Sequence, residues 1–362
     1  MDAAALSRSP LHERHERLGA KFAPFSGWLM PLEYAGVLAE HRAVREGVGL
    51  FDVSHLGKLR VTGPGAAAYL NTRLANDLGR IVPGKAQYTL LGTPDGGVTD
   101  DLIAYLNTPD DVLLIPNAAN AAAVAARLAD GAPAGVQVVD QHHEFAIIAV
   151  QGPGSPDALA AVGLPADMDY MAFETVQRGG VAFTVCRTGY TGEHGYELVV
   201  PAARAGQVWD ELAALDGVRP CGLGARDTLR TEMGYPLHGQ DISPDISPVE
   251  AGLVWAVGWD KPVFDGADAM RALRAQGPTR RLRGLTAVAR AIPRPGMAVV
   301  DAAGAQIGQV TSGTFSPTMR RGIALALVDV AHGLGERVGV RVRDRVEEFD
   351  VVKPPFVPAH VR

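Results

Sequence analysis

A strand, a Gly-Pro-Gly turn and a short helix occur in the same order at two places in this sequence. Residues 59–61 lead into Gly63-Pro64-Gly65 and the alanine-rich stretch 66–74, and residues 147–150 lead into Gly152-Pro153-Gly154 and the stretch 156–162. Glycine before a helix and proline in its first turn are typical of helix starts. The recurrence predicts two related α+β units, with chance recurrence of a common turn as the alternative.

The remaining pattern predicts further helices and a β-rich C-terminal region. Helices are expected at 11–19, 35–46, 118–128, 204–215, 225–234 and 266–275. A hairpin over 175–187, turning at Gly179-Gly180, precedes a strand at 197–200. Short strands punctuated by proline and glycine, which are typical of a barrel or sandwich, are expected at 283–289, 309–311, 324–330 and 338–342.

The length of the chain predicts more than one domain. A chain of 362 residues is too long for one ordinary hydrophobic core, so we expect two or three domains. The predicted division is a first region over 1–275, with possible inner boundaries near 50 and 140, and a C-terminal domain over 280–362.

Charge and cysteine content exclude several classes of protein. The net charge is −6 without a basic stripe, which disfavours a nucleic-acid partner. Cys186 and Cys221 are the two cysteines and form no C-x-x-C pair, so neither a disulfide framework nor a zinc knuckle is expected. The charged segment 11–17 has no apolar signal core, and no apolar run is long enough to span a bilayer. We therefore expect a cytoplasmic protein with no membrane partner.

Two adjacent carboxylates, Asp100 and Asp101, stand where a glycine turn runs into the apolar strand 102–105. Alternate residues of a strand share a face, so Asp101 is expected to lie with Tyr105, and Asp100 on the opposite face. One acid would then point into an interior or cleft and the other away from it. An inward carboxylate beside an aromatic ring suits a site for a protonatable amine or heterocycle. On spacing alone, a solvated turn carboxylate is the simpler interpretation.

The segment from Gly189 to Glu197 is dense in glycine and aromatic residues. Its glycines permit the close approach of a ligand, and its two tyrosines provide flat surfaces. A carboxylate such as Glu197 can accept two parallel hydrogen bonds from an aminopyrimidine edge. A tight hairpin with a solvated glutamate is the alternative interpretation.

The segment 222–230 is typical of a helix N-terminus and carries Arg226 and Arg230 one turn apart on the same face. A helix start with two guanidinium groups predicts a carboxylate-binding site. Pairing of both arginines on the surface with Asp227 or Glu232 is the alternative, and such pairs contribute little to stability.

A histidine at the end of a strand-like segment, His55, could serve as a base. A lone histidine is more often a packing residue, and this interpretation is the weaker one. The sequence has no G-x-S-x-G elbow and no H-E-x-x-H motif, so hydrolase and zinc-protease functions have no support.

Six segments taken together resemble the aminomethyltransferase (T-protein) family of the glycine cleavage system. The match runs almost from end to end, and the segments are 25–32, 51–55, 96–103, 189–193, 221–227 and 311–317. Each segment is a weak signal alone, whereas all six in this order are specific.

The resemblance implies an α+β fold arranged as a three-domain cloverleaf. Two related α+β units, ferredoxin-like or Greek-key, would surround a folate channel, and a jelly-roll-like β-barrel would form the C-terminal domain. The implied reaction transfers the one-carbon unit from an aminomethyl-dihydrolipoyl arm on the carrier H-protein to tetrahydrofolate. Ammonia is released and methylenetetrahydrofolate is formed. The implied partners are the lipoylated H-protein and tetrahydrofolate as acceptor substrate, and no metal is implied.

The motifs also imply roles for individual residues. Asp101 resembles the family's catalytic aspartate, and Glu197 resembles the glutamate that grips the pterin edge. Arg226 matches an arginine at the substrate site, and Tyr235 is expected to follow it on the same helix. The residues that align with the lining of the folate pocket are Leu56, Tyr88, Ile115, Asn117 and Trp255.

The chain departs from the family pattern at two places. Leu56 stands where methionine is usual, which is a volume-conserving change. Residues 355–362 lack the aromatic or multiply basic tail of many members, which leaves Arg362 as a weak candidate for contact with the folate glutamate tail.

Two alternative functions stay open at this point. One is a tetrahydrofolate-dependent demethylase acting on a free methylated donor, and the other is a non-catalytic folate-binding adaptor. The adaptors carry a lysine-glycine-cysteine segment where this chain has Arg187-Thr188-Gly189-Tyr190, which disfavours the adaptor.

Overall fold

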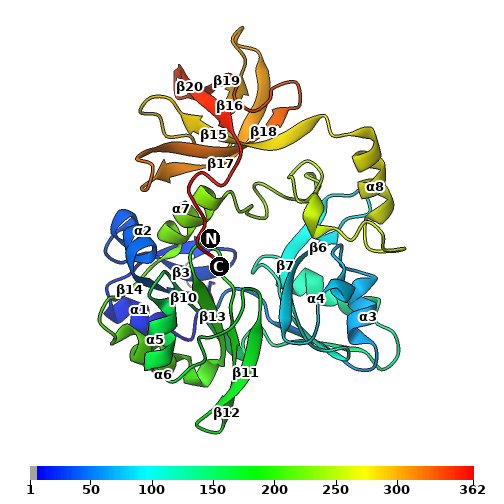
Figure 1. Ribbon diagram of the computed structural model, residues 1–362, viewed down its shortest axis with the longest axis vertical. Coiled ribbons are helices and arrows are strands. Elements are labelled where there is room, and N and C mark those ends of the chain that lie inside the picture. The colour runs from blue at the N-terminus through cyan, green and yellow to red at the C-terminus, as the bar shows by residue number, and fades with distance from the viewer. Residues whose placement is uncertain (1–5) are drawn as a thin grey trace.

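The computed structural model describes residues 6–362, so residues 1–5 of the predicted first region lie outside the described part. Figure 1 shows two mixed α+β bodies side by side, with a β-barrel above them and the C-terminal segment descending between them. The predicted α+β class and C-terminal barrel are confirmed.

The first body is built on a five-stranded sheet with strand order β6-β7-β8-β5-β9. Its strands are β5 (Leu59–Thr62), β6 (Lys85–Gly92), β7 (Val98–Thr108), β8 (Asp111–Ile115) and β9 (Gln137–Asp140). Its helices are α3 (Ala66–Asn71), the short 3-10 helix η2 (Leu78–Arg80) and α4 (Ala121–Asp130).

The second body contains a six-stranded sheet with strand order β11-β12-β13-β10-β4-β14. Its strands are β4 (Val48–Asp52), β10 (Phe145–Gln151), β11 (Phe173–Arg178), β12 (Val181–Cys186), β13 (Gly195–Pro201) and β14 (Val218–Pro220). Its helices are α2 (Val37–Glu46), α5 (Ser155–Ala161), α6 (Ala202–Ala213) and α7 (Leu223–Met233). The N-terminal segment adds α1 (His12–Arg17) and a small sheet of β1 (Ser7–Arg8), β2 (Lys21–Phe25) and β3 (Trp28–Glu33).

The two sheets repeat one plan. The strands correspond in chain order, so that β5 to β9 of the first sheet match β10 to β14 of the second. With this correspondence the two strand orders are identical, except that β4 is inserted between β10 and β14. The helices correspond in the same way, since α3 and α5 follow the first strand of each unit and α4 and α6 follow the fourth. This correspondence supports the predicted internal duplication.

The turn after the first strand shows why both units require glycine at the same place. Gly63 and Gly152 have φ values of 115° and 128°, a region that residues with a Cβ rarely adopt. A Cβ would lie 2.0 Å from the carbonyl oxygen of Gly135 in the first unit and 2.2 Å from that of Gly47 in the second. Each glycine N–H also donates to the carbonyl of the residue before the fourth strand, Asp110 or His194. In each unit this glycine therefore ties the turn after the first strand to the residue before the fourth strand.

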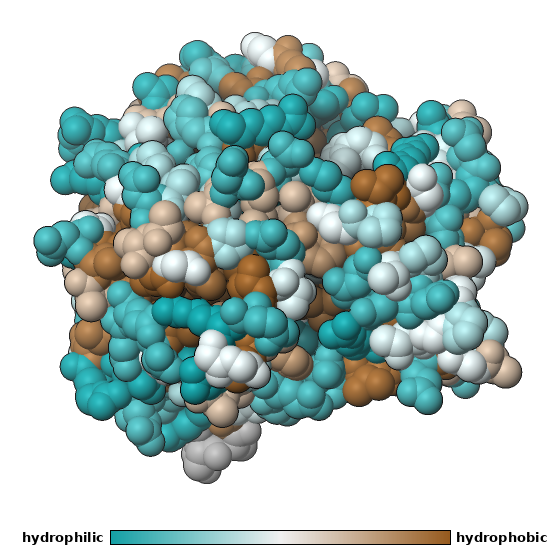
Figure 2. Space-filling model, turned by 60° about the horizontal axis from the view of Figure 1, so that its bottom comes forward, coloured by the Kyte–Doolittle hydropathy of each residue, from teal (hydrophilic) through white to brown (hydrophobic). Residues whose placement is uncertain are grey.

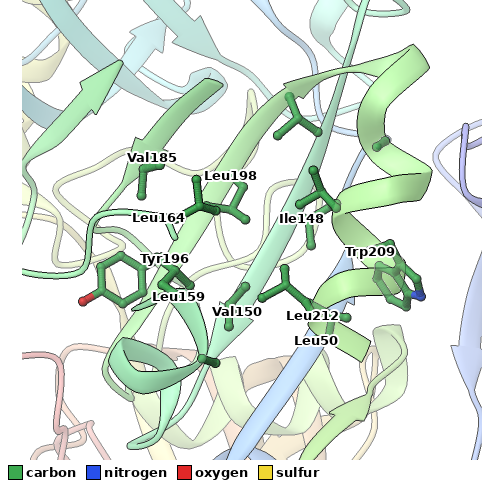
Figure 3. Packing of buried hydrophobic residues seen from close by; sticks show 14 of the residues in the cluster. Leu50, Ile148, Val150, Leu159, Leu164, Val185, Tyr196, Leu198, Trp209 and Leu212 are labelled. Atoms are coloured by element: carbon green, nitrogen blue, oxygen red, sulfur yellow. The ribbon is translucent and has the colours of Figure 1, made fainter. Parts of the chain in front are cut away.

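The core of the second body lies between its sheet and the helices α5 and α6. Figure 3 shows this cluster, in which strand residues such as Ile148, Val150 and Leu198 gather beside the helix that carries Trp209 and Leu212. All five side chains are essentially buried. Burial of a large apolar side chain contributes about 1.5–3 kcal/mol, so this cluster fixes the second sheet on its helices.

The C-terminal part is a closed six-stranded barrel with strand order β15-β18-β17-β16-β19-β20. Its strands are β15 (Arg280–Ala287), β16 (Ala298–Val300), β17 (Gln306–Ser316), β18 (Arg321–Asp329), β19 (Arg337–Val342) and β20 (Arg345–Val352). All neighbouring strands are antiparallel. The segment between α7 and the barrel contains η3 (Val254–Ala256) and α8 (Ala267–Gln276).

The surface agrees with a globular composition. Figure 2 shows a mostly hydrophilic face on which hydrophobic residues form separate patches. Among residues 6–362, no helix combines the length and the apolar character needed to cross a membrane. The predicted domain boundaries near 50, 140 and 280 stay a prediction.

We predict that Gly152→Ala lowers the free energy of unfolding by about 2–5 kcal/mol, because backbone strain adds to a clash with the Gly47 carbonyl. Gly163→Ala is the matched control, since Gly163 also has a positive φ of 71° but has no atom within 4 Å of the new Cβ. The control should lose only about 1–2 kcal/mol. Urea unfolding measures both values, and equal losses would show that close packing does not require glycine at position 152.

Candidate active site

A cavity of about 640 Å³ lies between the two sheets and is lined by residues from both bodies. Strands β6, β7 and β8 of the first sheet and β13 of the second contribute side chains to its wall. The nine residues to which the family resemblance gives a role all line this cavity, namely Leu56, Tyr88, Asp101, Ile115, Asn117, Glu197, Arg226, Tyr235 and Trp255. They come from segments almost 200 residues apart, so the fold is what brings them together.

The two carboxylates of β7 are held by amide groups of the segment that follows β8. Asp100 accepts hydrogen bonds from the backbone N–H of Asn117 at 3.0 Å, from Asn117 Nδ2 at 2.9 Å and from Asn120 Nδ2 at 2.7 Å. Asp101 accepts from the same Asn117 Nδ2 at 2.8 Å and from the Tyr88 hydroxyl at 3.0 Å. One side-chain amide thus bridges the two acids.

The interpretation of this pair as a solvated turn is wrong. Asp100 is completely buried, and Asp101 lies in the cavity wall. Asp100 does point away from the cavity, as alternation along the strand predicts, but it points into the protein interior and not into solvent. Burial raises the pKa of both carboxyl groups, and the charge of Asp101 raises the pKa of Asp100 further.

Aromatic rings cover the side of the cavity next to Asp101. The Tyr88 and Trp255 rings stack with their centroids 5.4 Å apart at an interplanar angle of 29°. Trp255 lies on η3 and is 61% exposed, so it forms the outer edge of this wall. Burial and the Asp101 charge raise the pKa of Tyr88 well above its usual value, which keeps its hydroxyl protonated as a hydrogen-bond donor.

The carboxylate of Glu197 enters the cavity from the other sheet, on β13. Its Oε2 accepts a 2.6 Å hydrogen bond from the Thr188 hydroxyl, which is 3.1 Å from the buried Tyr105 hydroxyl. Within residues 6–362 the other oxygen, Oε1, has no hydrogen-bond partner. Glu197 is therefore fixed by one oxygen and can accept from a ligand with the other.

The guanidinium of Arg226 lies over the Tyr190 ring, with its central carbon 4.7 Å from the ring centroid. Its Nη1 is buried and has no hydrogen-bond partner among the residues that the structure describes. Tyr190 in turn stacks on Tyr235 at 5.7 Å between centroids. Tyr235 lies beyond the end of α7 and not on it, because Gly234 ends the helix in the left-handed conformation. The buried Nη1 is a free donor on the cavity wall.

Arg230 does not share the environment of Arg226, so the prediction of a two-arginine carboxylate site is wrong. Arg230 is 2% exposed and forms ion pairs with Asp227 and Asp241, and it is absent from the cavity lining. The surface alternative holds only in part, since Arg230 pairs with the half-exposed Asp227 at 2.8 Å but is itself buried. Glu232 is buried and pairs with Arg45 at 2.7 Å. Arg226 and Arg230 lie one turn apart on the same helix, but their long side chains contact different partners.

His55 also lines the cavity, but burial and the charge of Arg226 lower its pKa to about 3. A base this weak is almost fully neutral at neutral pH and cannot take up a proton there.

Arg362 is exposed and does not line the cavity. Both cysteines are free and buried.

Some residues of the site were not predicted from the sequence, and three of them take part in its hydrogen bonds, namely Asn120, Thr188 and His238. Asn120 follows Asn117 by three residues, and such a pair of amides beside two carboxylates is a usable signal. Thr188 and His238 carry no signal, because each reaches its place through tertiary packing alone. His238 lies 3.0 Å through its Nδ1 from Asn120 and 2.9 Å through its Nε2 from the Val98 carbonyl.

Comparison with known proteins adds the family. The chain matches the model of the GCVT N-terminal domain over residues 11–261 and that of the glycine cleavage T-protein C-terminal barrel domain over residues 280–358. It is 60% identical over 362 residues to the aminomethyltransferase of Parafrankia sp. (strain EAN1pec), with 99% of each chain covered. It is 55% identical over 366 residues to the aminomethyltransferase of Mycobacterium tuberculosis (strain ATCC 25618 / H37Rv), with 100% of each chain covered.

A solved structure extends this likeness to the fold. The crystal structure of glycine cleavage system aminomethyltransferase T from Bartonella henselae superposes with a TM-score of 0.94 at 37% identity, covering 98% of this chain and 99% of that one. The chain therefore belongs to the glycine cleavage T-protein family, and it is an enzyme of aminomethyl transfer.

Proposed function

We propose that the cavity binds tetrahydrofolate and that the enzyme transfers to it the one-carbon unit of an aminomethyl-dihydrolipoyl arm carried by a lipoylated H-protein. The carbon–sulfur bond and the carbon–nitrogen bond to the departing ammonia break. Two carbon–nitrogen bonds to amine nitrogens of tetrahydrofolate form. The two protons that leave these nitrogens end on the lipoyl sulfur and on ammonia.

One observation carries the proposal. A carboxylate from each sheet, Asp101 and Glu197, enters one cavity whose wall also carries aromatic and apolar side chains. A flat heterocycle with donors at one edge and a reactive amine further along needs two acceptors of this kind at separate places. Aromatic faces such as Tyr88 and Tyr190 suit the flat ring.

Asp101 is the group we assign to proton transfer. Its raised pKa makes it a better proton acceptor than an exposed aspartate, and its negative charge stabilises a cationic iminium carbon during transfer. The hydroxyl of Tyr88 and the amide of Asn117 hold this carboxylate in one orientation. An acid fixed in this way is ready for the reacting nitrogen without reorganisation.

Glu197 and Arg226 are the groups we assign to substrate binding. The free oxygen of Glu197 would accept hydrogen bonds from the aminopyrimidine edge of the pterin. The free Nη1 of Arg226 would donate to a substrate acceptor. Burial lowers the pKa of this guanidinium, so an acidic substrate group beside it would be favoured. Leu56, Ile115 and Trp255 would exclude water from a hydrolysable intermediate. A cytoplasmic location stays a prediction.

We predict that ammonia is released from aminomethylated H-protein in the presence of tetrahydrofolate and only slowly in its absence. The physical reason is that folate nitrogen must take the carbon before ammonia can leave. A coupled ammonia assay measures the release rate. Rapid release without tetrahydrofolate would contradict the proposal, and turnover of a free methylated amine in place of the carrier would favour the demethylase alternative.

We predict opposite effects for two matched carboxylate-to-amide variants. Asp101→Asn should lower kcat by about 100-fold or more, as expected for loss of a general base, and leave the tetrahydrofolate Kd within about tenfold. Glu197→Gln should chiefly weaken tetrahydrofolate binding, by about tenfold or more, because it replaces a charged acceptor. Single-turnover kinetics and fluorescence titration separate the two quantities. Near-normal turnover of Asp101→Asn, or an unchanged Kd of Glu197→Gln, would remove the corresponding assignment.

A further inference from the structure

Asp100 lies directly behind the proposed base, and the mechanism above gives it no role. Its three hydrogen bonds all come from amide N–H groups, two from Asn117 and one from Asn120. An amide nitrogen donates and cannot accept, so this shell suits a carboxylate anion. A protonated Asp100 would lose an acceptor site to its own hydrogen and find no acceptor for it.

Asp101 has a different shell, which suits either protonation state. Its Oδ2 lies 3.0 Å from the Tyr88 hydroxyl, and a phenol can donate to a carboxylate or accept from a carboxylic acid. Its Oδ1 accepts from the amide of Asn117. Burial and the charge of Asp101 raise the pKa of Asp100, but a proton on Asp100 would find no acceptor among its partners. A proton on Asp101 would find one in the Tyr88 hydroxyl, so the hydrogen-bond partners favour Asp101 as the acid that gains and loses a proton.

Neither carboxylate of the pair forms an ion pair within residues 6–362. Buried ion pairs there join other acids, such as Asp52 with His15 and Asp241 with Arg230. The titratable groups that face the pair are Tyr88 on β6, Tyr190 in the segment before β13, and His238 in the segment after α7. The ring nitrogens of His238 lie 3.0 Å from the Asn120 amide and 2.9 Å from the Val98 carbonyl, so neither of them bonds a carboxylate of the pair. Two adjacent carboxylates without an ion-pair partner make the second ionisation costly.

We propose that Asp100 is the acid of this pair that stays ionised while Asp101 carries the proton, and that it is a positioning residue whose charge makes Asp101 a stronger base. This inference rests on the proposed function. As the folate nitrogen bonds to the transferred carbon, its proton moves to Asp101 and its electron pair stays in the new bond. Asp101 then returns the proton to the amine nitrogen, which takes the electrons of the breaking carbon–nitrogen bond and leaves as ammonia. The amides of Asn117 and Asn120 hold Asp100 as an anion. Only Asp101, on the cavity wall, therefore gains and loses a proton.

The test is the pH dependence of kcat in Asp100→Asn and Asp100→Ser. Both variants remove the charge, and the serine hydroxyl can still accept from the same amides if asparagine disturbs the fold. The acid limb of the profile reports the proton leaving Asp101, because the base works only when it is ionised. Loss of a neighbouring negative charge should move its midpoint to lower pH by about one unit or more. The tetrahydrofolate Kd should stay within about threefold.

The matched control is Asp95→Asn, which removes an exposed carboxylate from the turn between β6 and β7 and should leave the midpoint in place. Unchanged midpoints in both Asp100 variants, or an equal shift in the control, would overturn the inference. A measurement made without substrates tests this inference independently of the proposed function. Infrared titration of the protonated carboxyl band should show the same downward shift in the Asp100 variants, whether or not the wild type releases ammonia.

Discussion

The side-chain amide of Asn117 holds two neighbouring carboxylates of strand β7 at once, at 2.9 Å from Asp100 and 2.8 Å from Asp101. Buried acids side by side are stable only when donors replace the water that they lose. Asn117 comes two residues after β8, which pairs with β7, so the bridge exists only when these strands are in register. The acid at the cavity and the sheet that carries it therefore depend on each other.

The duplicated plan explains how a second carboxylate comes to the same cavity. Each unit supplies its sheet as one wall, and Glu197 on β13 enters from the unit opposite to that of Asp101. Helix α7 then joins the barrel to these walls. Its Arg226 lines the cavity, whereas its Arg230 donates to Ser312 of β17 at 2.9 Å. Glu232 at the end of the helix also accepts from Ser316 at 2.5 Å. Buried polar contacts on one helix thus fix the barrel and the substrate arginine together.

Much of the fold follows from local sequence signals. The two Gly-Pro-Gly turns mark the start of each unit because only glycine tolerates the positive φ and the close carbonyl at Gly63 and Gly152. The eight predicted helices and the C-terminal barrel are present because their sequence patterns are strong. Short or charged strands such as β9 and β20 escape prediction, since their sequences do not alternate clearly between apolar and polar residues.

The candidate site, like the fold, could be predicted from the sequence only in part. Motif resemblance places nine residues on one cavity, although spacing alone favours a solvated turn for the acid pair. Pairing of β7 with β8 buries the carboxyl group of Asp100, and no local sequence pattern around Asp100 reveals this. Arg226 and Arg230 have different partners, because Arg226 contacts the Tyr190 ring and Arg230 pairs with Asp241. Prediction fails where long-range packing selects the partner.

A crystal structure with tetrahydrofolate bound tests the central claim most directly, because it locates the substrate against both carboxylates. The expected density places the aminopyrimidine edge within hydrogen-bond distance of Glu197 and the reactive amine nitrogens on the side of Asp101. The pterin ring should lie against the aromatic wall of the same cavity. Folate bound elsewhere, or bound in this cavity without contact to either carboxylate, would contradict it.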